Sequence, residues 1–377
     1  MCQFIHIFLL LIVCSTSVKT KDDDSKLLSF VQLFRHGART PVMFFKDDPY
    51  KNVSYWGGLG RGQLTKEGKQ QLVELGRLMR RRYHDFIPEN YSAGFFKLNS
   101  DTNKRNIESM QKYLQGLYPS ITESQYDINI DSSILKAFIS PTFILQYLKL
   151  TVTSAKFRSF MKEHKKLFKY LLEYGKLDVP IPERLAHSYV VYDVLTTEKR
   201  NNLTLPEWTK SVFPENVTEL ARAFGKTMGY NRKMQKASVG PFLNVLVDHF
   251  DKISNQSTEE RILLFSGHDI NLMCLLNTFD VFDQFEYDVP AFANSIIFEM
   301  REKDGKHFIN GYYRILDHPD LYPITFKGCA FDCDYREFKE RLAVVRMNYK
   351  LLNRYNLDVT TETFSKTSLY QSLERLF

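Results

Sequence analysis

The sequence predicts an α/β protein with a layered core, in which a central and mostly parallel sheet is flanked by helices, and a smaller, mainly helical cap inserted in the chain. Two units in the first third repeat one plan: an apolar run of strand length, a polar loop and a helix-like pattern. A third apolar run, in the second half, also ends in polar residues. Repeated units of this kind are typical of sheets that carry ligand-binding loops at one edge.

The 377 residues are 44% hydrophobic and 25% charged, which is ordinary for one large globular domain or two smaller ones. Residues 1–17 read as a cleaved secretory signal, because an uncharged apolar run is followed by small residues and then a charged segment. A membrane anchor is the competing interpretation, but the run is shorter than a membrane span. We therefore expect a secreted chain without a membrane anchor, with the lysosome as the other compartment considered.

The first unit opens with Leu27 to Phe34, a short run rich in Phe, Val and Leu that predicts a buried central strand. It is followed by Arg35-His36-Gly37-Ala38-Arg39-Thr40-Pro41. The guanidiniums of Arg35 and Arg39 match phosphate oxygens, and a neutral His36 can attack the electrophile that they hold. A loop that is merely basic is the alternative, and the position directly after a buried strand argues against it.

A helix should follow, with Thr65 as its N-cap and apolar residues at helical spacing as far as Tyr83. The second unit then begins with Ala93 to Leu98, which predicts another buried strand. The polar stretch from Asn99 to Arg105 is expected to be the loop at its end, and a helix from about Asn106 to Leu117 completes the unit.

From about residue 121 to residue 238 the pattern becomes mainly helical, and Phe157 to Tyr174 carries Lys, Leu and Phe at helical spacing. We interpret 121–238 as a helical cap inserted into an α/β core. That core is expected to comprise residues 18–120 and 239–377.

The third strand is expected at Arg261 to Ser266, and it runs into Gly267-His268-Asp269 ahead of another helix. His268 would favour an anion at the start of that helix. Asp269 is the plausible acid for protonating a departing alcohol, provided that its carboxyl keeps a proton. Ser295 to Met300 and His307 to Ile315 predict two antiparallel edge strands joined by a hairpin turn.

The cysteines predict little chemistry. Cys329 and Cys333 are close enough to close a small loop, as expected in an oxidising compartment. Cys274 is expected to be a buried small hydrophobic residue. We expect no metal site, because two Cys without a second pair or paired His fall short of four ligands.

The formal net charge of +7 and the isoelectric point near 8.9 favour anionic partners such as phosphate esters, glycans or lipid head groups. Nucleic acid is disfavoured, because the basic residues are dispersed without a recognisable binding module. Five N-glycosylation sequons support an exported chain. Their asparagines are Asn52, Asn90, Asn202, Asn216 and Asn255.

Arg35 to Pro41 resembles the R-H-G-x-R-x-P signature of the histidine acid phosphatases, the secreted and lysosomal branch of the histidine phosphatase superfamily. Further similar segments follow in the order of the family: Gly62-Gln63-Leu64-Thr65, Leu203 to Trp208, Ser266 to Asp269, and Gly328 to Cys333 with its late disulfide. In character the chain is most similar to the insect venom acid phosphatases.

The resemblance implies a two-part α/β fold with a helical cap and hydrolysis of phosphate monoesters without a cofactor or metal. Carried over residue by residue, it makes His36 the phosphohistidine nucleophile and Asp269 the proton donor. Arg35, Arg39 and His268 would form the phosphate clamp.

One departure concerns the family stretch R-S-x-x-x-x-R-x-x-x-S, in which Asn99 stands at the expected third phosphate-binding Arg. Asn99 is expected to bind the substrate through a hydrogen bond from its amide. The amide brings no charge, so transition-state stabilisation would fall by roughly five- to thirtyfold. Lys97, Lys104 or Arg105 could reach into the site in its place. Arg105 matches the second Arg of the stretch, for which we favour a structural ion pair.

Three functional hypotheses follow. The leading one is an active secreted acid phosphatase. The second, motivated by Asn99, is a catalytically impaired relative that serves as a secreted binding protein or venom antigen. A phosphomutase is the third, and the predicted signal and sequons argue against it. The sequence leaves open the physiological substrate and whether the chain forms a homodimer.

Overall fold

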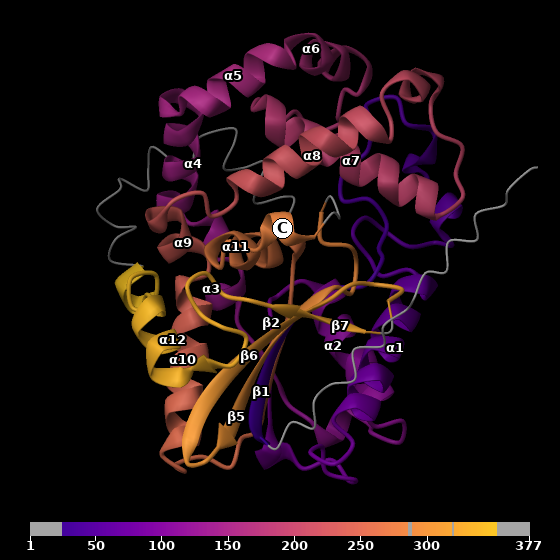
Figure 1. Cartoon of the computed structure of the whole chain (residues 1–377). Helices are drawn as coiled ribbons and strands as arrows, with labels where there is room; N and C mark the ends of the chain where they lie inside the picture. Colours follow the sequence, from indigo (N-terminus) through magenta and orange to yellow (C-terminus); the bar gives the residue numbers. More distant parts are fainter. Residues whose placement is uncertain (1–24, 286–288, 319, 353–377) are drawn as a thin grey trace, which may run out of the picture.

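The computed structural model describes residues 25–285, 289–318 and 320–352. The signal expected at residues 1–17 lies outside these residues. Figure 1 shows a twisted sheet with helices on both of its sides and a further group of helices beyond one end of the strands. Within the described ranges, no helix is both long enough and apolar enough to cross a membrane.

The sheet has eight strands, in the order β3-β2-β4-β1-β5-β6-β7, with β8 paired to β6. As predicted, the strands of the core (β3, β2, β4 and β1) are parallel, whereas the later strands pair in antiparallel fashion. The carboxyl ends of β1, β2 and β4 therefore share one edge. The strands are β1 Lys26–Arg35, β2 Phe96–Ser100, β3 Ile128–Ile130, β4 Ile262–Gly267, β5 Ser295–Lys303, β6 Lys306–Arg314, β7 Leu321–Ile324 and β8 Cys333–Asp334.

Strand β1 lies near the centre of the sheet, and its side chains alternate between two buried faces. Phe30 and Phe34 pack toward helices α1 (Lys66–Arg82) and α2 (Lys104–Leu117). Val31 and Leu33 face the opposite side, which helices α10 (Gly240–Ser254) and α11 (Asp269–Thr278) cover. Both faces of β1 are apolar because helices cover both, as expected of a strand in a parallel sheet.

Helix α1 begins as the sequence predicts, because the hydroxyl oxygen of Thr65 accepts a hydrogen bond from the Gly68 N–H at 3.1 Å. The second strand differs from the prediction. Residues Ala93–Phe95 form a 3-10 turn, and β2 starts at Phe96 and includes Asn99. Asn99 is therefore part of a strand and not of the loop after it.

Strands β5 and β6 form the predicted hairpin, in which Asp304 and Gly305 have φ values of 52° and 72°. The prediction that they are edge strands is wrong, because β5 pairs with β1 on its other side and β6 pairs with β7. The short β7 contains Pro323 and was not recognised as a strand.

Residues 121–238 are mainly helical, although β3 in this segment joins the sheet beside β2. The expected single run from Phe157 to Tyr174 is divided at His164 into two helices. The helices of this insertion are α3 Ser132–Leu135, α4 Pro141–Thr153, α5 Ala155–Glu163, α6 Lys165–Tyr174, α7 Arg184–Arg200, α8 Glu215–Thr227 and α9 Arg232–Ser238. Helix α12 spans Tyr335–Leu342, and the 3-10 turns are Pro49–Lys51, Val53–Trp56, Ala93–Phe95, Glu123–Gln125, Ala137–Ile139, Glu207–Ser211 and Phe282–Gln284.

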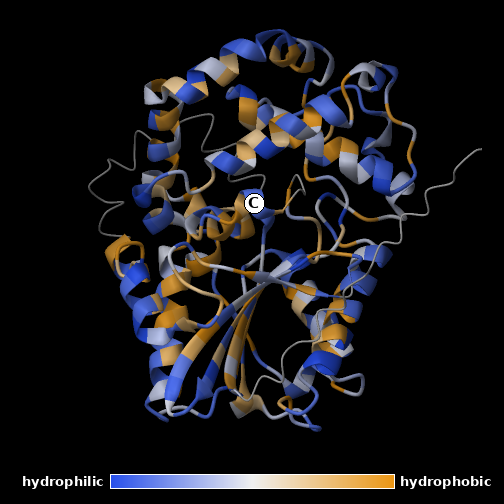
Figure 2. Cartoon of the chain, viewed as in Figure 1, coloured by the Kyte–Doolittle hydropathy of each residue, from blue (hydrophilic) through white to orange (hydrophobic). Residues whose placement is uncertain are grey.

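One hydrophobic core continues from the sheet into the insertion. It includes Leu33 on β1, Val190 on α7 and Leu171 on α6. Figure 2 shows hydrophobic residues concentrated in the strands and in α11, which lies between the sheet and the upper helices. The insertion is therefore packed as part of the same interior.

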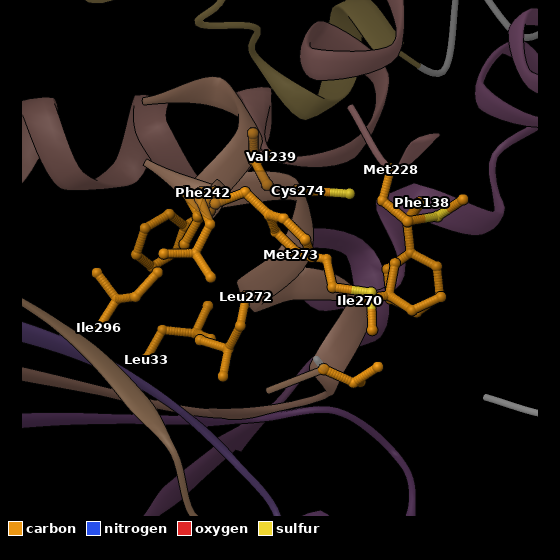
Figure 3. Close-up of a cluster of buried hydrophobic side chains, with 14 of the residues drawn as sticks. Leu33, Phe138, Met228, Val239, Phe242, Ile270, Leu272, Met273, Cys274 and Ile296 are labelled. Atoms are coloured by element: carbon orange, nitrogen blue, oxygen red, sulfur yellow. The ribbon is translucent and has the colours of Figure 1, made fainter. Parts of the chain in front are cut away.

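Figure 3 shows Cys274 within this core, close to Val239, Phe242 and Met273. Its side chain is fully buried, and burial raises the pKa of the thiol to about 12, so Cys274 is the unreactive buried residue that we predicted. Cys329 and Cys333 form the predicted disulfide, with their Cα atoms 5.4 Å apart.

Candidate active site

Polar residues that follow three parallel strands meet at one edge of the sheet. His36 follows β1, Asp101 follows β2 and His268 follows β4, and all three are buried. The rings of His36 and His268 lie 5.6 Å apart between centroids and are inclined at 77°. The structure thus brings together the two predicted stretches, which are more than two hundred residues apart in the sequence.

The loop after β1 is fixed against the start of α1. A Cβ added to Gly37 would lie 2.2 Å from the carbonyl oxygen of Gly68, and one added to Gly68 would lie 1.9 Å from that of Ala38. The backbone N–H of Ala38 also donates a hydrogen bond to Gln71 on α1 at 2.9 Å. Gly37 thus permits a close approach of the loop to helix α1.

His36 has a defined tautomer. Its Nδ1 lies 2.9 Å from the carbonyl oxygen of Gly37, which can only accept, so Nδ1 carries the proton and Nε2 keeps its lone pair. Burial lowers the pKa of His36 well below its ordinary value, and the charges of Arg105, Arg35 and Arg39 lower it further. Both effects favour the neutral form of the imidazole, in which Nε2 keeps its lone pair.

Arg35 is held on two sides. Its Nη1 donates to the carbonyl oxygen of Pro290 at 2.7 Å, and its Nη2 lies 2.5 Å from the Oδ2 of Asp269. Burial would raise the pKa of Asp269, but the charge of Arg35 and a hydrogen bond from Tyr189 outweigh burial, and the pKa is lowered. Asp269 is therefore ionised in the ligand-free protein.

Arg39 is paired with a carboxylate from the insertion. Its Nη2 lies 3.1 Å from both carboxylate oxygens of Asp193 on α7, and Asp193 also lies 3.9 Å from Arg35. The guanidinium carbons of Arg35 and Arg39 lie 4.2 and 5.7 Å from the ring centre of Phe292. Asp193 and Phe292 thus hold the two cations in place from opposite parts of the chain.

Arg105, near the start of α2, is a third cation of the cluster and was not assigned to the site from the sequence. Its residue is 9% exposed, and among the residues that the structure describes it has neither an ion pair nor a hydrogen bond. Burial lowers its pKa to about 10 and the charge of Arg39 adds to this effect, although the carboxylates of Asp101, Asp269 and Asp193 oppose it. A buried cation that has lost water and forms no direct ion pair favours an anion beside it.

His268 caps α11, and its Nε2 donates to the buried carboxylate of Asp101. The backbone N–H of His268 also donates to Asn271 at 2.9 Å. Burial lowers the pKa of His268 even though Asp101 favours its charged form. Asp101 thus fixes the orientation of the ring that faces His36.

Asn99 is placed apart from these contacts. Its amide nitrogen lies 3.4 and 3.3 Å from the carbonyl oxygens of Lys97 and Leu264, and its amide oxygen accepts from Asn129 on β3. These bonds hold the amide within the sheet, so the structure does not support Asn99 as a phosphate ligand. The favoured role of Arg105 as a structural ion-pair partner is likewise unsupported, because it has no carboxylate partner within the described residues.

Three residues of this cluster were not expected from the sequence: Asp101, Asp193 and Phe292. Arg105 was considered for the site, but a structural role was favoured. Only Asp101 and Arg105 carried a local signal, because they stand in the polar stretch after a predicted strand. Asp193 lies in a helix with no motif around it, and Phe292 is one of 30 Phe residues. Their positions depend on tertiary contacts that no local pattern reveals.

Three arginines, a neutral imidazole and a carboxylate at the end of a parallel sheet are groups typical of an enzyme that transfers a group from a small anion. Comparison with known proteins identifies the class more closely. Residues 26–143 match the family model for histidine phosphatase superfamily (branch 2).

Three similar proteins are acid phosphatases, each 27% identical to this chain. They are the prostatic acid phosphatase of Bos taurus (85% of this chain and 86% of the relative covered), the venom acid phosphatase of Apis mellifera (85% and 86%) and the human lysosomal acid phosphatase (83% and 77%). Among solved structures, the apo phytase of Hafnia alvei is 14% identical, with a TM-score of 0.68 over 87% of this chain and 98% of that one. The phytase of Citrobacter braakii is 16% identical, with a TM-score of 0.65 over 85% and 98%.

The chain is thus similar to the histidine phosphatase superfamily (branch 2) over residues 26–143, and to acid phosphatases over most of its length. The family resemblance and the fold class predicted from the sequence are both confirmed.

Proposed function

We propose that the protein is an active, secreted acid phosphatase that hydrolyses phosphate monoesters through a phosphohistidine on His36. The observation that supports this most is the environment of His36: a neutral ring with Nδ1 protonated, surrounded by three arginines. A nucleophile that resists protonation, next to cations that attract an anion, suits an ester hydrolase that works in acid.

In the first step a phosphate monoester binds Arg35, Arg39 and Arg105, which spread positive charge over its non-bridging oxygens. The lone pair on Nε2 of His36 attacks phosphorus, and the bond from phosphorus to the ester oxygen breaks. Asp269 gives the departing oxygen a proton, so that an alcohol leaves. The products of this step are phosphohistidine, the alcohol and an ionised Asp269.

Asp269 must be protonated for this step, although its pKa is lowered in the free protein. The bound ester resolves the conflict in two ways. Its negative charge offsets that of Arg35, which raises the pKa of Asp269. A phosphate monoester also has a second pKa near ~6, so in acid it carries a proton that can pass to the carboxylate.

In the second step the ionised Asp269 takes a proton from water, and the resulting hydroxide attacks the phosphohistidine. The bond from nitrogen to phosphorus breaks, the electron pair returns to Nε2, and inorganic phosphate leaves. Asp193 and Asp101 take no proton in this scheme. They hold Arg39 and His268 in position.

The test uses p-nitrophenyl phosphate at about pH 5, with His36→Ala compared with His84→Ala, an exposed histidine outside the site. We expect His36→Ala to lose turnover and to lose a phosphoryl label that is stable in alkali and labile in acid, whereas His84→Ala keeps both. Full turnover in His36→Ala would reject the mechanism.

Export remains part of the proposal. The five sequon asparagines are all exposed, which supports glycosylation in the secretory pathway. Expression in insect cells should give secreted protein whose mass falls on treatment with an N-glycosidase. A catalytically impaired binding protein is the alternative, and the buried Arg105 argues against it, because this residue offers the site a third positive charge where Asn99 brings none.

A further inference from the structure

The surface of the helical insertion carries a strong concentration of positive charge. We call residues 149–176 the basic segment; it comprises the end of α4, all of α5 and α6, and the first residues of the turn that follows. It holds eight of the 51 Lys and Arg residues of the chain and only two of the 44 Asp and Glu residues. Six of the seven net positive charges of the chain therefore lie in these 28 residues.

All eight cations are exposed, and within the described part of the chain none of them forms an ion pair. They are Lys149, Lys156, Arg158, Lys162, Lys165, Lys166, Lys169 and Lys176. Elsewhere on the surface many cations are neutralised, for example Lys69 by Glu108 at 2.6 Å and Lys339 by Asp251 at 2.7 Å. The basic segment is thus an uncompensated patch, not an average piece of surface.

The arrangement of the segment leaves its cations facing outward. The apolar residues Phe157, Phe168 and Leu171 are buried in the core, so the lysines occupy the opposite faces of α5 and α6. Figure 1 shows α5 and α6 at the end of the molecule farthest from the sheet. The acidic residues on the segment are Glu163 and Glu173, and the neighbouring Glu219 is bound to His164 at 3.2 Å.

We propose that the basic segment is a docking surface for a linear sulfated polysaccharide. Sulfate groups repeated along a flexible chain can contact several spaced lysines at once, and each contact adds to the others. Lysine presents a compact charge on a flexible stem, which fits a series of sulfates without demanding one geometry. The surface lies outside the His36 cluster and is independent of the proposed hydrolysis.

An anionic membrane is the other polyanion that a basic surface could meet, and the structure favours it less. Membrane binding by an amphipathic helix requires an apolar face that enters the lipid. Here the apolar faces of α5 and α6 are already buried in the core. The exposed apolar residues Val152, Leu172 and Tyr174 lie at the ends of two different helices and do not form one such face.

The test measures the binding of the full-length secreted protein to heparin. The four-site variant Lys162→Gln, Lys165→Gln, Lys166→Gln, Lys169→Gln is compared with a control of equal net charge. The control replaces four other exposed lysines by Gln: Lys233, Lys252, Lys303 and Lys306. We expect the segment variant to bind heparin at least about tenfold more weakly than the wild type, since four ionic contacts are removed, and the control to bind almost as well as the wild type.

Turnover of p-nitrophenyl phosphate and the melting temperature should be the same in all three proteins. Weaker heparin binding could then not be explained by unfolding of the variant. Equal weakening in variant and control would mean that net charge alone governs binding, and the proposal would be wrong. Binding to phosphatidylserine vesicles without binding to heparin would equally overturn it.

Discussion

Arg35 and Asp269 form a direct buried ion pair, with the Nη2 of Arg35 at 2.5 Å from the Oδ2 of Asp269. The residue proposed to bind phosphate therefore also controls the residue proposed to donate the proton. Among the residues that the structure describes, Arg35 has Asp269 and the more distant Asp193 as counterions, and the carboxyl of Asp269 has a lowered pKa. Any anion that takes up the charge of Arg35 must raise that pKa, and this coupling is open to measurement.

The first prediction is that anion binding takes up a proton. Sulfate is the probe, because it does not titrate between pH 4 and pH 7. Calorimetry in buffers of different ionisation enthalpy should show protons taken up when sulfate binds, and affinity should fall with rising pH by up to about tenfold per unit. The experiment uses a His36→Ala background, which removes the other titrating group that faces the anion. Asp269→Asn in that background should abolish the uptake, and uptake that persists would exclude Asp269 as its source.

The second prediction concerns which residue supplies the third charge. Arg105→Gln should lower kcat/KM on p-nitrophenyl phosphate by about a hundredfold or more, because a buried donor to the transition state is lost. Asn99→Arg should not raise turnover. It should instead destabilise the protein by several kcal/mol (about 3 or more), because it buries an unpaired charge inside β2. A gain in turnover with Asn99→Arg would restore the original interpretation.

The third prediction is that Asp193 acts as a counterion whose loss a bound anion can replace. Asp193→Asn leaves the buried Arg39 and Arg35 undercompensated, so we expect a loss of about 3 to 5 kcal/mol in stability. Inorganic phosphate should then raise the melting temperature more in Asp193→Asn than in the wild type, because the anion supplies the missing negative charge. Equal phosphate shifts in the two proteins would show that Asp193 does not balance these arginines.

The fourth prediction is a dependence of stability on pH that originates outside the site. Glu198 on α7 is fully buried, and burial, with a further contribution from Asp48, raises its pKa to about 9. The folded protein thus keeps a proton that the unfolded chain releases near pH 4.5. Stability should therefore fall as the pH rises from about 4.5 toward 9. Urea unfolding should show Glu198→Gln gaining on the wild type between pH 5 and pH 8. A constant difference would contradict the raised pKa.

The sequence predicts the parts of this fold that local patterns determine. Apolar runs predict β1 and β4, and the N-cap Thr65 predicts the start of α1. The polar residues directly after the two strands indicate the positions of His36 and His268. The prediction for Asn99 failed for a local reason: β2 begins three residues later than its apolar run, so the polar residue at its end belongs to the strand.

Other failures were tertiary. Asp193 reaches Arg39 from a helix 154 residues away, and that contact exists only because the insertion packs on the sheet. Nothing in the sequences of β5 and β6 indicates that β7 pairs with the outer edge of β6. The positions of such residues depend on how the whole core packs. A local sequence pattern does not indicate that packing.

The shared interior of sheet and insertion has a mechanical consequence. Leu33, Val190 and Leu171 belong to one continuous hydrophobic core. The helices of the insertion are therefore not expected to move relative to the sheet as an independent lid. A shortened chain that lacked them would expose the side of α11 that packs against α8 and α9 to water. We therefore expect selection for new substrates to work by exchanging side chains around the entrance, while the architecture as a whole stays rigid and melts as a single unit.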